Sequence, residues 1–147
     1  MSVSAEMIAE VLGGRRVLGR PVRTMRDLDA IVREGISKTA LDTFINSFTA
    51  PHQGTDLTVK LRNKIVPRAT YQRVERFNLQ VSETTERLAR LYAIALSVFE
   101  EREAARRFLT TPHPELDNRA PFDVALTEIG GREVEEVIER GLHGLPA

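Results

Sequence analysis

Cysteine is absent from this chain of 147 residues, so neither a disulfide nor a thiolate metal site can form. The three histidines, at positions 52, 113 and 143, fall in expected loops or tails and are not paired at the spacing of metal ligands. We therefore expect no metal site and no cofactor. A chain without disulfides also suits a reducing compartment, and we expect it to be cytoplasmic.

Long apolar runs are absent as well. The longest, residues 91–99, is interrupted by Ser97, whereas a membrane-spanning helix needs about 20 apolar residues. The first residues lack the basic segment and the apolar core of a signal peptide. We therefore expect neither a membrane partner nor secretion.

The chain has no net charge, but its two halves are oppositely charged. Residues 1–80 hold thirteen Lys or Arg against eight Asp or Glu, a net charge of +5, and residues 81–147 hold eight against thirteen, a net charge of −5. This asymmetry suggests that the first half meets a polyanion such as nucleic acid and that the second half does not. Chance clustering of solvated surface charge is the alternative.

The alternation of apolar and polar residues that is typical of strands is also missing, and apolar residues recur at every third or fourth position instead. We therefore predict an all-α fold. Cap and stop residues delimit the predicted helices, which cover residues 3–12, 24–34, 37–48, 55–65, 67–76, 82–100, 102–109, 121–129 and 132–140. Residues 15–22 are expected to form a loop. Thr24, with Asp27 three residues on, is expected to form a capping box, and Ser37 is expected to cap the next helix. Ser82 is expected to cap the longest, central helix, and Gly130-Gly131 to separate the last two helices.

A basic pair of short helices is expected within residues 57–76, where six Lys or Arg and one Glu give a net charge of +5. Two short helices joined at Val66-Pro67 have the geometry of a helix-turn-helix, whose second helix can read bases in the major groove. Guanidinium groups, amides and hydroxyls suit guanine edges, adenine edges and phosphates. The candidate DNA-binding residues are Lys60, Lys64, Arg68, Thr70, Gln72, Arg73 and Arg76. A merely solvated, Arg-rich face is the alternative.

Residues for catalysis are scarce, because catalysis needs a nucleophile, a base or a metal in convergent geometry. Glu135 and Glu139 lie four residues apart on the last predicted helix, where they repel each other rather than form a catalytic dyad. Gly13-Gly14 follows a helix instead of a strand, so it is not a phosphate-binding loop. Nothing in the sequence indicates an enzyme, and we expect no catalytic residue. An acidic docking surface on the last helix remains open.

Several motifs of the second half occur in a fixed order: residues 111–116 (TPHPEL), 120–124 (APFDV), 130–135 (GGREVE) and 143–144 (HG). In order and spacing they resemble the antitoxins of RES-Xre toxin-antitoxin pairs, which share a C-terminal toxin-binding domain named MbcA/ParS/Xre. The resemblance runs from about Leu57 to the last residue and is densest from Glu101 onward.

The resemblance implies an all-helical type II antitoxin that forms a homodimer and has two roles. Residues 1–80 would form an Xre-like helix-turn-helix domain that binds operator DNA and represses transcription of the operon. Residues 81–147 would form a helical domain for dimerisation and toxin binding. The partner would be a cognate RES-domain toxin, an NAD-consuming protein similar to ADP-ribosyltransferases, whose active site the C-terminal helix and tail would cover. The implied toxin-binding residues are Arg132, Glu133, Glu136, Glu139, Arg140, Leu142, His143 and Gly144.

One departure from the family is Ala120, which stands where Ser or Thr usually caps the following helix and should weaken that helix start by about 1 kcal/mol. Two other functions remain open. One is a stand-alone helix-turn-helix transcriptional regulator, whose C-terminal half only dimerises or senses a ligand. The other is an unrecognised helical enzyme.

Overall fold

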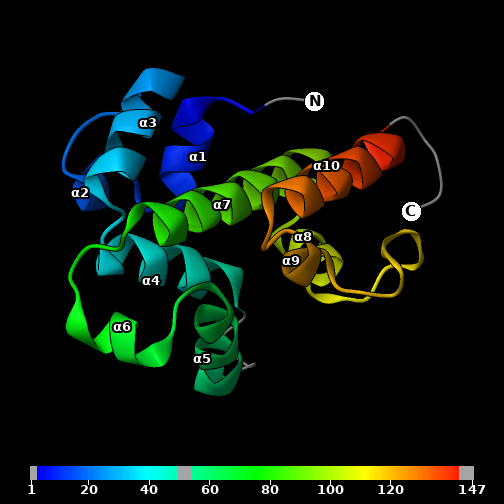
Figure 1. Ribbon diagram of the computed structural model, residues 1–147. Helices are drawn as coiled ribbons and strands as arrows, with labels where there is room; N and C mark the ends of the chain where they lie inside the picture. Colours follow the sequence, from blue (N-terminus) through cyan, green and yellow to red (C-terminus); the bar gives the residue numbers. More distant parts are fainter. Residues whose placement is uncertain (1–2, 50–53, 143–147) are drawn as a thin grey trace.

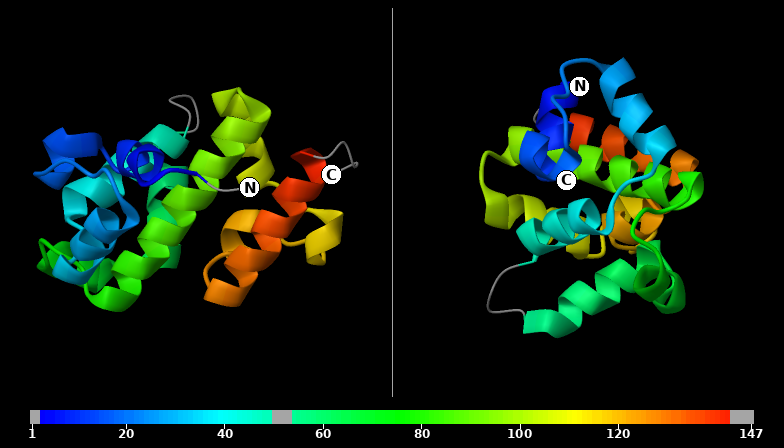
Figure 2. Two further views of the ribbon diagram at one scale, coloured as in Figure 1. Left: turned by 90° about the horizontal axis from the view of Figure 1, so that it is seen from above. Right: turned by 90° about the vertical axis from the view of Figure 1, so that its left-hand side faces the viewer.

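The computed structural model describes residues 3–49 and 54–142, and these residues form helices and no β-strand. Figures 1 and 2 show the helices gathered around one long helix. The elements are Ala5–Val11 (α1), Gly14–Leu18 (α2), Met25–Glu34 (α3), Lys38–Phe48 (α4), Gly54–Ile65 (α5), Arg68–Arg73 (α6), Leu79–Phe99 (α7), Arg102–Thr110 (α8), Pro114–Leu116 (η2, a 3-10 turn), Pro121–Val124 (α9) and Glu128–Leu142 (α10). The predicted all-α fold class is confirmed.

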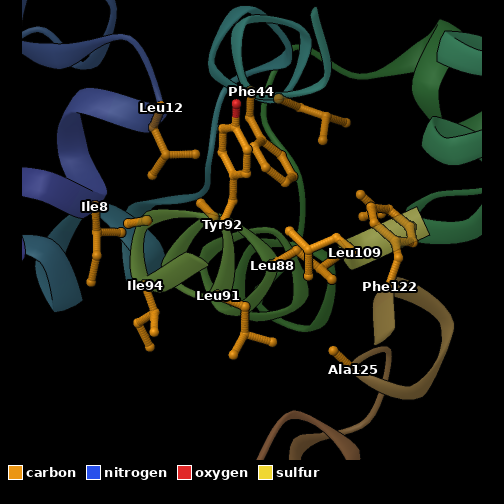
Figure 3. Packing of buried hydrophobic residues seen from close by; sticks show 14 of the residues in the cluster. Ile8, Leu12, Phe44, Leu88, Leu91, Tyr92, Ile94, Leu109, Phe122 and Ala125 are labelled. Carbon is orange, nitrogen blue, oxygen red and sulfur yellow. The ribbon is translucent and has the colours of Figure 1, made fainter. Parts of the chain in front are cut away.

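The long helix α7 lies at the centre of the core. It contacts α1, α3, α4 and α5 from the first half of the chain and α8 and α10 from the second. Figure 3 shows Ile8 and Leu12 on one side of α7 and Phe122 on the other, while Tyr92 lies beside Phe44 with ring centroids 6.2 Å apart. The buried hydrophobic side chains of both halves form one cluster around α7. The division into residues 1–80 and 81–147 stays a prediction.

Local caps begin α3 and α4 as predicted. Thr24 Oγ1 accepts the backbone N–H of Asp27 at 3.1 Å, and the Asp27 carboxylate accepts the backbone N–H of Thr24 at 3.1 Å, which completes a capping box. Hydrogen bonds from the backbone N–H groups of Arg23 and Thr24 lower the pKa of Asp27. Ser37 Oγ accepts the backbone N–H of Ala40 at 3.1 Å. The starts of these two helices are therefore encoded locally.

The start of α7 differs from the prediction. Asn78, not Ser82, is the N-cap, and its Oδ1 accepts the backbone N–H of Val81 at 2.9 Å. Ser82 lies one turn inside the helix and is buried. Its hydroxyl accepts the backbone N–H of Ile36 at 2.8 Å and donates to the Phe77 carbonyl at 3.2 Å. The serine thus links α7 to the segment before α4, a use that sequence spacing does not reveal.

Residues 15–22, which were predicted as a loop, contain most of the short helix α2. Gly13 (φ 109°) and Gly19 (φ 81°) flank this helix in the left-handed region. Val17 and Leu18 pack against the core. The glycines therefore bound a short helix instead of marking a loop, because their positive φ angles let the chain turn at both ends.

Candidate functional site

Helices α5 and α6 form the predicted basic pair, and they lie beneath α4 in Figure 1. Val66 and Pro67 join them, and Pro67 (φ −57°) is the N-cap of α6 rather than its first helical residue. Helix α6 ends at Arg73, so Arg76, predicted inside this helix, follows it. No residue of α6 is buried. The helix therefore presents most of its side chains to solvent.

Most of the predicted DNA-binding side chains lie on the surface. The exposed ones are Lys60, Lys64, Arg68, Gln72, Arg73 and Arg76, and Thr70 is partly buried. Two of the cations have partners within the chain. Lys64 Nζ lies 2.6 Å from Asp123 Oδ1 of α9, and Arg76 Nη1 donates to the Gly35 carbonyl at 3.0 Å. These two side chains therefore offer only part of their donor capacity to a phosphate.

Tyr71 holds α6 in place. Its hydroxyl donates to the Asp42 carboxylate of α4 at 2.7 Å, and its ring stacks on Phe77 with centroids 6.3 Å apart. The Arg62 guanidinium lies 3.9 Å from the centroid of the Tyr71 ring, and Lys38 Nζ lies 4.8 Å from it. Burial and then the hydrogen bond to Asp42 raise the pKa of Tyr71. The sequence analysis did not reveal the two cations next to the Tyr71 ring.

Helix α10 has one buried face and one charged face. Val134, Val137 and Ile138 are buried in the core. The exposed residues of the helix are Glu128, Ile129, Arg132, Glu133 and Glu136. Arg132 Nε donates to Glu128 Oε2 at 3.1 Å. The structure therefore brings Arg132, Glu133 and Glu136 of the predicted toxin-binding set together on one outward face.

The pair Gly130-Gly131 was predicted to end a helix, but it lies inside α10. A Cβ at Gly130 would lie 1.7 Å from the Val124 carbonyl oxygen, and a Cβ at Gly131 would lie 2.7 Å from Arg87 Cδ. At both distances an added side chain would force neighbouring atoms to move, and at Gly130 the neighbour is backbone. Thr127, the residue before α10, caps the helix, and its Oγ1 accepts the backbone N–H of Gly130 at 3.0 Å. The glycines thus allow the first turn of α10 to approach α9 and α7 closely.

Arg87 of α7 fixes the start of α10, and the sequence analysis missed it. Its side chain is buried, its Nη1 donates to the Ala125 carbonyl at 3.1 Å, and its Nε lies 3.4 Å from Glu128 Oε1. Burial raises the pKa of Glu128, but hydrogen bonds from Arg132 and Arg87 outweigh it and leave that pKa below its ordinary value. A signal was present, because Arg87 lies four residues before Leu91 on the apolar stripe of its helix.

The last turn of α10 is tied to the loop after α8. Arg140 Nη2 lies 2.7 Å from Glu115 Oε1, and His113 Nδ1 accepts the backbone N–H of Glu115 at 3.1 Å. Arg140, a predicted toxin-binding residue, is therefore partly buried in an ion pair within the chain. Glu139 is also partly buried. The remaining predicted toxin-binding positions, the Leu142 side chain, His143 and Gly144, lie outside the described residues.

Metal-binding clusters and membrane-spanning helices are both missing from the described parts of the chain. Within residues 3–49 and 54–142, no group of three or more His, Asp or Glu side chains is placed to hold a metal ion. Among the described helices, none has the length and hydrophobicity that crossing a bilayer requires. His52 and His143 lie outside the described residues, and His113 is buried.

The family comparison covers the end of α7 and all of α8, α9 and α10. Residues 95–144 match the family model described as Antitoxin Xre/MbcA/ParS C-terminal toxin-binding domain. No curated protein matches the chain. The matched stretch contains the motifs on which the resemblance was based, at residues 111–116, 120–124, 130–135 and 143–144. The predicted resemblance to the Xre/MbcA/ParS toxin-binding domain is therefore confirmed for this part of the chain.

Proposed function

We propose that this chain, whose residues 95–144 match the toxin-binding domain of the Xre/MbcA/ParS antitoxins, is an Xre-type antitoxin that neutralises a cognate RES-domain toxin. In this proposal α10 and residues 142–147 cover the active site of the NAD-consuming toxin. The chain also forms a homodimer and represses transcription of its own operon by binding operator DNA through α5 and α6. Residues 81–147 serve the first role, and residues 1–80 serve the second.

The outward face of α10 supports the toxin-binding role most strongly. Glu133 and Glu136 are exposed there, while the opposite face of the helix packs on α7. A cleft that binds NAD needs positive or polar groups for the pyrophosphate, and acidic side chains at its rim complement such groups. The chain continues from α10 into residues 143–147, so a toxin bound to this face is within reach of the tail.

The exposed cations of α5 and α6 support the DNA-binding role. Arg68, Gln72 and Arg73 project from a helix that has no buried residue, and they offer the guanidinium and amide donors that base edges and phosphates accept. Tyr71 fixes this helix on α4 and α5, which reduces the ordering that binding would otherwise require. Figure 1 shows α6 and α10 at opposite ends of the view.

Co-expression with the RES-domain protein of the neighbouring gene tests the toxin-binding role. We expect the chain to restore growth and to co-purify with that protein. Deletion of residues 142–147 is expected to weaken neutralisation and to leave operator binding unchanged. A chain that binds the operator but neither rescues growth nor co-purifies would be a stand-alone regulator, which contradicts the proposal.

Salt-dependent binding to the promoter tests the DNA-binding role. Arg68→Ala and Arg73→Ala are each expected to lower operator affinity, and the loss of one phosphate contact lowers the slope of log affinity against log salt by about 1. Arg26→Ala, at an exposed arginine of α3, is the matched control and should change neither value. An operator affinity that does not change with salt concentration, or that is equal in all three variants, argues against DNA binding through α5 and α6.

A further inference from the structure

Ile129 is the most exposed large hydrophobic residue in the described part of the chain. Its exposed fraction is 78%, whereas the other exposed large hydrophobics, Met7, Met25, Val59 and Leu79, range from 39% to 53%. It is not among the hydrophobic side chains that pack against the core. A single exposed apolar residue is ordinary by itself. The position of Ile129 and the side chains around it are what distinguish it.

Ile129 lies on the charged face of α10. Arg132 and Glu133 follow it at three and four residues, and Glu136 at seven, so these side chains neighbour it on one side of the helix. Arg132 is bound to Glu128, while Glu133 and Glu136 form no ion pair with any residue that the structure describes. Ile129 is therefore a protruding apolar side chain with unpaired acidic groups beside it. This composition is that of an interface anchor with a polar rim.

The turn that carries Ile129 is held on both sides. Thr127 caps it through the Gly130 N–H at 3.0 Å, and Arg87 fixes the preceding residues through the Ala125 carbonyl at 3.1 Å. Gly131 lies against the Arg87 side chain. Such a turn needs little ordering when a partner binds, which favours affinity.

We propose that Ile129 is the apolar anchor of the toxin contact, and that it enters an apolar socket bordered by Lys or Arg side chains on the RES-domain toxin. This proposal rests on the proposed function. The toxin is the occupant that the observations favour, because Ile129 lies inside the matched toxin-binding domain and beside unpaired carboxylates. The contact then extends along α10 from its first turn, and is not confined to its acidic end and the tail.

Affinity for the purified neighbouring RES-domain protein provides the first test. Ile129→Ser is expected to weaken binding about 10-fold or more, as the loss of an interface anchor does. Leu79→Ser is the matched control, because Leu79 is 52% exposed and lies outside residues 95–144, and it should leave affinity unchanged. Equal affinity of Ile129→Ser and the unsubstituted chain would overturn the proposal while leaving the proposed function intact. If the unsubstituted chain does not bind the toxin, the proposed function itself fails.

A photo-crosslinking measurement identifies the occupant without relying on a weakened variant. The change Ile129→p-benzoylphenylalanine is expected to give an adduct with the mass of chain plus toxin, and the same probe at Leu79 should give none. An adduct of two copies of this chain would overturn the proposal in favour of a dimer contact. The absence of any adduct in a complex that still forms would overturn it as well.

Discussion

Helices α6 and α10 are both outward-facing, yet the chain holds them by opposite means. Helix α10 has a buried apolar face, and its first turn fits against α9 and α7 only because Gly130 and Gly131 lack side chains. Helix α6 has no buried residue and is held by Tyr71, through a hydrogen bond to Asp42 and a guanidinium over its ring. The helix that carries the acidic surface is therefore held by core packing, whereas the helix that carries the basic surface is held by a few polar contacts.

The two surfaces are therefore vulnerable to different kinds of substitution. Steric close packing tolerates almost no added volume, so changes at the start of α10 should affect the whole fold. Polar contacts at a partly exposed site can be weakened in steps, so changes around Tyr71 should affect the basic surface before they unfold the chain.

The largest expected effect is at the start of α10. Gly130→Ala would place a methyl group 1.7 Å from the Val124 carbonyl oxygen, so we expect it to lower the free energy of unfolding by about 4 kcal/mol. Gly141→Ala is the control in the same helix, because a Cβ there meets no atom within 4 Å, and it should raise stability by about 0.5 kcal/mol. Urea unfolding measures both. Similar effects of the two substitutions would remove the steric explanation of the glycine pair.

The next largest effect is expected at Tyr71, whose polar contacts hold α6. Tyr71→Phe removes a hydrogen bond to the charged Asp42 and is expected to cost about 2 kcal/mol. Tyr92→Phe, which removes a bond to the Ser47 carbonyl at 3.2 Å and a hydrogen bond with Arg106, is the comparison and should also cost about 2 kcal/mol. Operator affinity should fall only for Tyr71→Phe. If Tyr92→Phe lowers it equally, Tyr71 has no particular role in presenting α6.

A smaller effect, of opposite sign, is expected at the start of α9. Ala120 is the N-cap of that helix and makes no side-chain capping bond, as the sequence predicted. Ala120→Ser should supply one and raise the free energy of unfolding by about 1 kcal/mol. Ser37→Ala, which removes an existing cap, should lower stability by a similar amount. A destabilised Ala120→Ser variant would mean that the residue before Pro121 is chosen for packing instead.

The smallest effect is a pH dependence between α7 and the start of α10. Burial raises the pKa of Glu86 above its ordinary value, while Arg90 and Arg87 oppose that effect. The folded chain then binds a proton at Glu86 more readily than the unfolded chain, so the stability from this group is present at low pH and lost as pH rises through the folded pKa. Relative to Glu86→Gln, the unsubstituted chain should gain stability as pH falls from 7 toward 4.5. Guanidinium unfolding at several pH values should show this trend, and a constant difference would argue against a raised pKa.

The sequence predicted those features that depend on neighbouring residues. The Thr24 capping box, the Ser37 cap and the break before α9 follow from residues within three positions of one another. The role of Gly130-Gly131 was misread, because a glycine pair signals a helix stop and a close approach equally well. Only the positions of the Val124 carbonyl and of the Arg87 side chain in the fold distinguish the two.

Contacts between distant residues were beyond the reach of sequence patterns. Lys64 pairs with Asp123 across 59 positions, and Ser82 bonds to the Ile36 N–H across 46. For this reason the candidate DNA-binding set included two cations that already have partners, and the exposed Ile129 was overlooked as one more apolar position of an amphipathic helix.

The rate of NAD consumption by the purified neighbouring RES-domain toxin, measured at increasing ratios of this chain, tests the proposed neutralisation most directly. We predict that the rate falls to background once the chain is in excess, and that much of it persists when residues 142–147 are deleted. A rate that stays unchanged at a large excess of the full chain would contradict the proposal.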